Sequence, residues 1–274
     1  MTTYEERTEL LAAAVNAARA AAEVLEGGYR KRLDVERKGR IDLVTEYDRN
    51  SERLVRDMLS RHTGLPVVGE EEGGSAAADG PTWYVDPLDG TTNFVHGHPY
   101  FAVSLGLVEA GRAVLGVVLA PALRLEWTGV VEGTYDTLLP EGARRDARRN
   151  GEPCAVSSTE ELLEAMLATG FPYDVHTSDD NNLAAFGQII RRCQAIRRCG
   201  SAALDLCHVA EGTFDGYWER KLKPWDLAAG AAIVVAAGGT LSNFGGFSVK
   251  VTDGHVLATN GPLHRLLVAE LTGR

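Results

Sequence analysis

Hydrophobic positions near the start of the chain recur with the period of a helix. Between residues 4 and 26 the apolar residues lie three or four positions apart and share one face: Leu10, Leu11, Ala14, Ala18, Ala21, Ala22 and Leu25. Gly27 and Gly28 end the run, as glycines commonly do at a helix C-terminus. This helix is expected to pack against the core and to carry no chemistry. A second helix is predicted after Thr45, with an apolar stripe of Leu54, Val55, Met58 and Leu59.

The pattern then changes to short apolar or alternating runs, which are typical of strands. These runs cover residues 66–70, 83–85, 101–109, 113–120, 123–131 and 135–139. The runs 101–109 and 113–120 are joined by Ala110 and Gly111, so they are predicted to form a hairpin. We expect a long, mostly antiparallel sheet with helices packed against it.

A charged stretch at 141–153, with an Asn150-Gly151 turn, is the predicted boundary between two halves, 1–145 and 146–274, of one compact catalytic unit. Its arginines alternate with acids and lack aromatic neighbours, which favours a solvated loop over a nucleic-acid patch. Beyond it, helices are predicted near 160–168, 181–192, 201–211, 225–237 and from 262, with strands at 193–197, 214–219, 240–242 and 255–258. This alternation favours an α/β half with helices on both sheet faces.

Composition narrows the class of protein. The chain has 274 residues, 45% hydrophobic and 24% charged, which suits one large domain or two packed halves. A net charge of −10 argues against non-specific binding to nucleic acid or membrane. The longest apolar run, near 231–237, is too short to cross a bilayer, and the acidic N-terminus does not resemble a signal peptide. The four cysteines form no CxxC pair and are expected to be reduced thiols, so a cytoplasmic location is predicted.

The candidate chemistry centres on residues 83–94, WYVDPLDGTTNF. Its aromatic and β-branched start is typical of a strand that is about to end, and the following turn carries Asp86 and Asp89. Gly90 and Thr91 come next and offer backbone N–H groups to an anion. An Asp-rich turn without chemistry is the alternative. The ligand spacing of an EF-hand calcium loop is absent.

Three further acids occupy ends of predicted elements. Glu70 ends the strand at 66–70, and Asp226 begins the apolar helix after Trp225. Asp48 lies three residues after Thr45, a plausible capping box for the second helix. If Glu70, Asp226 and the acids of residues 83–94 meet in space, their carboxylates would repel and their pKa values would rise. A divalent cation removes that conflict, and oxygen ligands alone favour Mg²⁺.

Taken in order, these pieces resemble the inositol monophosphatase family of magnesium-dependent, lithium-sensitive phosphatases. The resemblance covers roughly residues 38–240 and is carried by Asp42-Leu43-Val44-Thr45 with Asp48, Gly69-Glu70-Glu71, Asp86 to Phe94, Gly200-Ser201-Ala202-Ala203, Glu219 and Trp225-Asp226. It implies an α+β / α/β fold, the layered α-β-α-β-α sandwich of the inositol monophosphatase and fructose-1,6-bisphosphatase type. It also implies a homodimer.

The resemblance implies a role for each matching residue. Two to three Mg²⁺ ions would be held by Glu70, Asp86, the backbone carbonyl of Leu88, Asp89 and Asp226. Catalysis would use Thr91 with Glu70 or Asp48 to orient the attacking water. Substrate contacts would come from Asp89, Gly90, Thr91, Gly200, Ser201, Ala202, Glu219 and Asp226.

The predicted function is hydrolysis of myo-inositol 1-phosphate, or a related polyol phosphate, by a metal-activated water. Relatives with the same chemistry act on fructose 1,6-bisphosphate, 3′-phosphoadenosine 5′-phosphate or histidinol phosphate. Glu219 and the compact length favour inositol, whereas the basic stretch 220–223 would favour a second anionic group on the substrate. An alternative of another class is a regulatory binding protein of the transcription machinery. The intact set of acids argues that catalysis is retained.

Overall fold

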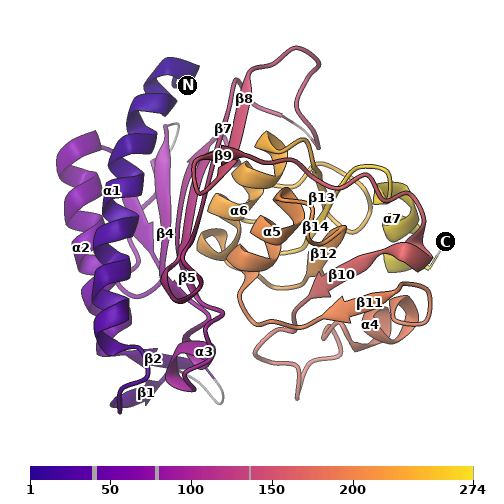
Figure 1. Ribbon diagram of the computed structural model, residues 1–274, viewed down its shortest axis with the longest axis horizontal. Coiled ribbons are helices and arrows are strands. Elements are labelled where there is room, and N and C mark those ends of the chain that lie inside the picture. The colour runs from indigo at the N-terminus through magenta and orange to yellow at the C-terminus, as the bar shows by residue number, and fades with distance from the viewer. Residues whose placement is uncertain (39–41, 78–79, 136, 274) are drawn as a thin grey trace.

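The computed structural model describes residues 1–38, 42–77, 80–135 and 137–273, and its elements stack in five layers (Figure 1). The layers follow one another across the molecule as helices, sheet, helices, sheet and helices. The helices are α1 (Tyr4–Gly28) and α2 (Glu46–Thr63) in the first layer, α5 (Ala202–Ala210) and α6 (Pro224–Ala236) in the middle, and α4 (Leu183–Ile189) and α7 (His264–Thr272) in the last. The predicted α-β-α-β-α sandwich is therefore confirmed.

The larger sheet has seven strands in the order β3-β4-β5-β6-β7-β8-β9. Its strands are β3 (Val67–Gly69), β4 (Thr82–Asp89), β5 (Ala102–Glu109), β6 (Arg112–Ala120), β7 (Leu125–Val131), β8 (Arg145–Arg149) and β9 (Glu152–Pro153). Every neighbouring pair is antiparallel except β3 and β4, which run parallel. The predicted hairpin is confirmed as β5 and β6.

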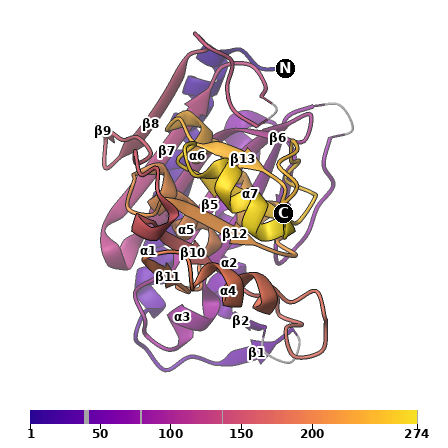
Figure 2. The same cartoon turned by 90° about the vertical axis from the view of Figure 1, so that its right-hand side faces the viewer.

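The smaller sheet has five strands in the order β11-β10-β12-β14-β13, seen from another side in Figure 2. Its strands are β10 (Met166–Thr169), β11 (Ala195–Arg197), β12 (Gly216–Glu219), β13 (Thr240–Ser242) and β14 (Val256–Thr259). The remaining elements are β1 (Val35–Arg37), β2 (Leu43–Thr45), α3 (Thr91–Val95) and two 3₁₀ turns, η1 (Pro121–Leu123) and η2 (Leu162–Glu164). Within the described ranges no helix combines the length and apolarity that crossing a bilayer requires.

Three predictions of local structure are wrong. The helix predicted at 160–168 is the 3₁₀ turn η2 followed by strand β10, because the apolar residues from Ala165 onwards are buried inside the smaller sheet. The charged stretch 141–153 contains β8 and β9 at the edge of the larger sheet, where exposed charges are compatible with a strand. The described residues of 135–139 form no strand, although Tyr135 and Leu139 are buried.

A row of glycines brings α6 close to the larger sheet. Gly106, Gly116 and Gly129 are register partners across β5, β6 and β7. A Cβ atom on Gly116 would lie 2.1 Å from the carbonyl oxygen of Ala229 in α6, and the other two glycines approach the same helix almost as closely. Any larger residue in this row would push the helix away. The row therefore fixes how closely α6 packs against the sheet.

Candidate active site

The end of β4 carries two of the candidate acids, and it is a bulge rather than the predicted end of the strand. Asp86 pairs with Ser104 and Asp89 with Ala102, so β4 has one residue more than β5 between these positions. Side chains alternate between the two faces of a regular strand, and residues three apart would point to opposite faces. The extra residue shifts this alternation, because a bulge re-aims the side chains that follow it. Both aspartates can therefore serve one site.

The backbone brings the other two acids to the same place. The N–H of Glu70, directly after β3, donates to the carbonyl of Val85 at 3.2 Å, which puts Glu70 beside Asp86. On the other side, the Ser104 hydroxyl donates to the Trp225 carbonyl at 3.4 Å, and Ser104 is the register partner of Asp86. The first turn of α6, which holds Asp226, therefore lies beside the bulge. Acids more than 150 positions apart in the sequence meet at one point.

Electrostatics confirms that the four carboxyl groups influence one another. Burial raises the pKa of Asp86 well above its usual value, and the charges of Glu70, Asp89 and Asp226 raise it further. The pKa of Asp226 is raised well above its usual value by burial and then by Glu70 and Asp89. Burial also raises the pKa of Glu70 to about 7 and that of Asp89 to about 6. The cluster is thus electrostatically unfavourable when all four groups are ionised.

Each of the three aspartates is oriented by backbone N–H groups. The N–H of Leu88 donates to Oδ1 of Asp86 at 2.9 Å, and the N–H of Lys223 donates to Oδ2 of Asp226 at 2.7 Å. Oδ2 of Asp89 accepts hydrogen bonds from the Ser201 hydroxyl at 2.6 Å and from a backbone N–H of α5. Within the described ranges, Asp86 and Asp226 receive these bonds on one oxygen only.

This donor set suits a hard divalent cation. Its ligands would be carboxylate oxygens and a backbone carbonyl, which Mg²⁺ prefers. The acids are close and repel one another, and a cation would relieve that repulsion. In the described part of the chain no three His, Cys, Asp or Glu side chains are arranged to hold an ion as they stand. The hydrogen bonds to Lys38, Ser201 and Lys223 turn the carboxylates, so binding would require side chains to rotate.

Asp48 and Thr91 form a hydrogen-bonded pair next to the bulge. The Thr91 hydroxyl lies 3.0 Å from Oδ1 of Asp48 and 3.1 Å from the carbonyl oxygen of Leu88. The other oxygen of Asp48 accepts from the backbone N–H and the hydroxyl of Thr45, so the predicted capping box is present. Burial raises the pKa of Asp48. Of the two acids suggested as partners for Thr91, the structure places Asp48 in contact with it.

The other candidate substrate residues lie at the start of α5 and at the end of β12. Gly200 and Ser201 precede α5, and a Cβ atom on Gly90 would lie 3.2 Å from the Gly200 carbonyl oxygen. Glu219, at the end of β12, accepts a hydrogen bond from the Tyr217 hydroxyl at 2.5 Å. Burial raises the pKa of Glu219 to about 7, and its charge contributes to the raised pKa of Asp226. The predicted substrate side and the acid cluster are therefore neighbours.

Sequence reasoning missed two residues of this region. Lys38 forms an ion pair with Glu70 at 2.9 Å and a second one with Glu71. Burial opposes its charge, but the two glutamates outweigh burial and raise the pKa of Lys38. Asn93 binds backbone carbonyls on two other segments. Only the position of Asn93 inside residues 83–94 could have drawn attention to it, and a lone lysine gave no signal.

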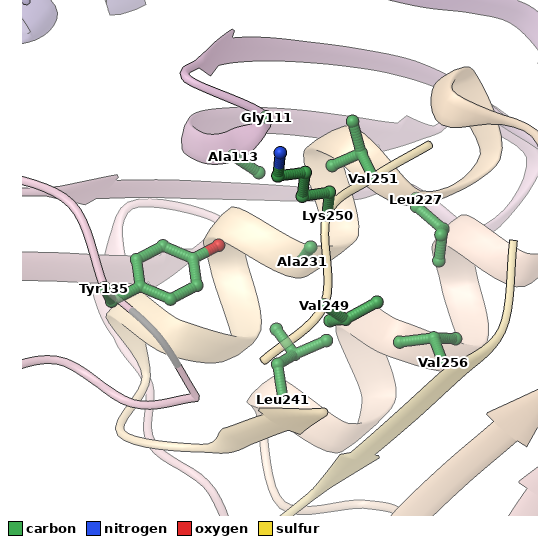
Figure 3. A pocket seen from close by; sticks show the side chains of 10 residues that line it. All are labelled: Gly111, Ala113, Tyr135, Leu227, Ala231, Leu241, Val249, Lys250, Val251 and Val256. Carbon is green, nitrogen blue, oxygen red and sulfur yellow. The ribbon is translucent and has the colours of Figure 1, made fainter. Parts of the chain in front are cut away.

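A cavity between α6 and the segment 249–251 is not part of this site (Figure 3). Its volume is about 10 Å³, room for at most one water molecule. Its lining is mostly apolar, with Lys250 and Tyr135 as the polar exceptions, and it includes no carboxylate. It carries none of the candidate chemistry.

The layered fold and the buried acids beside the β4 bulge define the class of protein, which is a phosphatase. The chain matches the family model described as "Inositol monophosphatase family" over residues 6–273 and belongs to this family. Enzymes of the family depend on metal ions, typically Mg²⁺.

Individual relatives cover most of the chain. The Synechocystis sp. protein named inositol-1-monophosphatase is 40% identical over 236 residues, 85% of this chain and 78% of its own length. The Nus factor SuhB of Pseudomonas aeruginosa is 37% identical over 271 residues, 96% of this chain and 95% of its own. The solved structure of the inositol monophosphatase from Anabaena (Nostoc) sp. PCC 7120 superposes with a TM-score of 0.85 at 38% identity, and the match covers 97% of this chain and 96% of that one.

Proposed function

We propose that this phosphatase is a Mg²⁺-dependent phosphomonoesterase that hydrolyses myo-inositol 1-phosphate, or a closely related polyol phosphate, with a metal-activated water. The observation that supports it most is the meeting of Glu70, Asp86, Asp89 and Asp226, whose pKa values are all raised. Strongly perturbed acids clustered in one place are typical of functional sites. Here they need positive charge that the cluster itself does not contain.

The proposed metal ligands are Glu70, Asp86, the carbonyl of Leu88, Asp89 and Asp226. Bound Mg²⁺ would polarise the phosphate, lower the pKa of a water and stabilise the leaving alkoxide. The chain keeps the three aspartates beside the bulge through the Leu88 and Lys223 N–H groups and the Ser201 hydroxyl, and the carboxylates would rotate to share the cation. These bonds leave carboxylate oxygens of Asp86 and Asp226 for the cation.

The attacking water would be oriented by Thr91. Because the Thr91 hydroxyl can give its proton to Asp48 at 3.0 Å, an oxygen lone pair remains to accept a hydrogen bond from the water. The backbone N–H groups of Gly90 and Thr91 would bind phosphate oxygens. The final acceptor of the water's proton stays open between Glu70 and Asp48.

Specificity for a polyol would come from the segment 200–202 and from Glu219. A buried carboxylate that accepts hydrogen bonds from substrate hydroxyls discriminates well, because an analogue without them leaves it unpaired. Two of the three charges in the basic stretch after Glu219 are already paired, which weakens the case for a second phosphate. Arg220 lies 2.7 Å from Asp180, and Lys221 lies 2.8 Å from Asp174. This pairing favours a monophosphate over fructose 1,6-bisphosphate or 3′-phosphoadenosine 5′-phosphate.

A regulatory role in transcription is the second candidate, because relatives named Nus factor SuhB align over almost the whole chain. The net charge of −10 offers no general attraction to RNA. We propose this role as an addition to catalysis. We also propose that the protein is a homodimer and that it is located in the cytoplasm. Light scattering would test the dimer. Pull-down from cell extract with wild type and Asp89→Asn would show whether transcription proteins bind independently of activity.

A phosphate-release screen tests the proposal. The substrates are inositol phosphates, fructose 1,6-bisphosphate, histidinol phosphate and 3′-phosphoadenosine 5′-phosphate, each with Mg²⁺ and with a chelator. The expected result is preferred release from myo-inositol 1-phosphate that disappears with the chelator. Release that persists without metal contradicts the mechanism, and a clear preference for another ester corrects the substrate.

A further inference from the structure

The side-chain amide of Asn93 joins two segments that are far apart in the sequence. Its nitrogen donates to the carbonyl oxygens of Tyr100 at 2.7 Å and Cys199 at 2.9 Å, and the carbonyl of Gly200 lies 3.4 Å away. All three partners are acceptors, so the nitrogen and not the oxygen of the amide must face them. An amide nitrogen has two hydrogens, and the two short bonds use both of them.

The two segments are in close contact at this point. Gly90 and Gly200 both have positive φ, +93° and +85°, which favours glycine. A Cβ atom on Gly200 would lie 3.3 Å from the amide nitrogen of Asn93, and one on Gly90 would lie 3.0 Å from the carbonyl oxygen of Tyr100. Backbone therefore packs against backbone, with the amide of Asn93 between the segments.

Two further contacts hold the same segments together. Asp89 accepts hydrogen bonds from Ser201 and from the N–H of Ala203. The hydroxyl of Tyr100 donates to Oδ1 of the buried Asp205 in α5 at 2.8 Å. Asp89 is also a candidate metal ligand, so its substitution cannot separate positioning from chemistry. In the described part of the chain the side-chain hydrogen bonds of Asn93 all go to backbone carbonyls, which makes it the informative residue.

We propose that Asn93 is a positioning residue that sets the distance between the phosphate-binding loop, residues 89–91, and the polyol-binding segment, residues 199–202. This inference rests on the proposed function, because those two segments hold the two ends of one substrate. A substrate that spans both segments needs them at a fixed spacing. Displacement by about 1 Å can lower the rate about 100-fold when the reacting groups lose alignment. A phosphate ester without ring hydroxyls would use the metal site and the phosphate-binding loop but not the polyol contacts of the second segment.

The test compares two substrates in variants of the full-length enzyme with Mg²⁺. Asn93→Ala removes both donors. We expect kcat/KM for myo-inositol 1-phosphate to fall about tenfold or more, and kcat/KM for p-nitrophenyl phosphate to fall less than about threefold. Asn93→Asp keeps the shape but turns a carboxylate toward the carbonyl oxygens, so it should show the larger difference. If the alanine variant does not fold, Asn93→Ser provides the comparison.

Asn260 offers a matched control. It is a buried amide, and its nitrogen donates to the carbonyl of Thr159 at 2.8 Å and to the Ser157 hydroxyl at 3.0 Å, outside the candidate site. Asn260→Ala should lower the melting temperature but change kcat/KM for both substrates by the same factor.

Equal losses on the two substrates in Asn93→Ala, or no loss on either, would overturn the proposal. Failure of the proposed function looks different, because wild type would then cleave p-nitrophenyl phosphate but not the inositol ester. In that case the comparison is repeated with whichever polyol ester the screen identifies.

Discussion

Buried acids occur in two settings in this molecule, and the difference between them indicates what the site requires. Glu109 is 2% exposed and accepts hydrogen bonds from Arg7 at 2.9 Å and from the N–H of Thr2. Glu52 is fully buried and pairs with Arg56 at 3.0 Å, and it also accepts the N–H groups of two neighbouring residues. For Glu109 and Glu52, the fold supplies both a cation and hydrogen-bond donors.

Asp86 is as buried as Glu109 but has different surroundings. It is 2% exposed and accepts one backbone N–H, from Leu88. The charges that act most strongly on it come from Glu70, Asp89 and Asp226, and all are negative. Lys38 pairs with the glutamates at one edge of the cluster. Since a buried, unpaired charge is strongly unfavourable, this contrast supports the proposal that a bound cation supplies the positive charge.

Removing a site acid should have the largest effect. We expect Asp86→Asn to lower kcat/KM by on the order of 10³-fold, because a metal ligand is lost. The same substitution should raise the melting temperature of the metal-free protein, since it removes a charge that its neighbours repel. Activity assays and thermal unfolding measure the two effects. Loss of stability without metal would mean that the cluster is not strained.

Removing a structural acid should lower the stability of the protein and leave its activity nearly unchanged. Glu109→Gln leaves the buried guanidinium of Arg7 without its partner, which costs about 3–5 kcal/mol of stability. The kcat/KM of the folded protein should stay within about twofold of wild type, because the pair lies outside the candidate site. Urea unfolding and the standard assay measure the two quantities. If Glu109→Gln lost as much activity as Asp86→Asn, the distinction between structural acids and site acids would be contradicted.

The two settings also predict how stability depends on pH. The pKa of Glu70 is raised to about 7 and that of Asp89 to about 6, so the folded metal-free protein binds more protons than the unfolded chain between about pH 4 and 7. The contribution of Glu70 and Asp89 to stability should therefore be largest below that window and fall as pH rises through it, by on the order of 1 kcal/mol per pH unit. Saturating Mg²⁺ should remove this slope. Urea unfolding from pH 4 to 8 measures it, and a rise in stability would contradict the sign.

Glu219 should affect activity less than Asp86 does, because it is expected to act on specificity rather than on metal binding. Glu219→Gln should lower kcat/KM for myo-inositol 1-phosphate about tenfold and that for p-nitrophenyl phosphate much less. The measurement is the ratio of the two values in variant and wild type. Equal losses on both would remove Glu219 from substrate recognition.

The first helix could be predicted from the sequence, because a long periodic run such as 4–26 has one stable interpretation, whereas the layered arrangement is implied by the resemblance to the family. Short runs could not. Residues 160–168 have helical composition, but burial inside the smaller sheet makes 166–169 a strand. Glycines within apolar strands are a sign that another element packs closely against the sheet. The alignment of Gly106, Gly116 and Gly129 into one row, however, depends on the register of the strands, which no local sequence pattern gives.

The candidate acids could be proposed from motifs, but their meeting could not be demonstrated. The convergence of the acids depends on the extra residue between Asp86 and Asp89 and on the packing of α6 against the sheet. Both are properties of the assembled sheet. Contacts such as Lys38 with Glu70 and Asn93 with Cys199 join segments whose separation in the sequence hides them.

The most direct test of the central claim is anomalous diffraction from crystals of the wild-type protein soaked with Mn²⁺ in place of Mg²⁺. We predict anomalous peaks at the β4 bulge, with carboxylate oxygens of Asp86, Asp89, Asp226 and Glu70 about 2.0–2.3 Å away. Crystals of Asp86→Asn should show weaker peaks or none. A well-occupied manganese site elsewhere, with none at these four acids, would contradict the account.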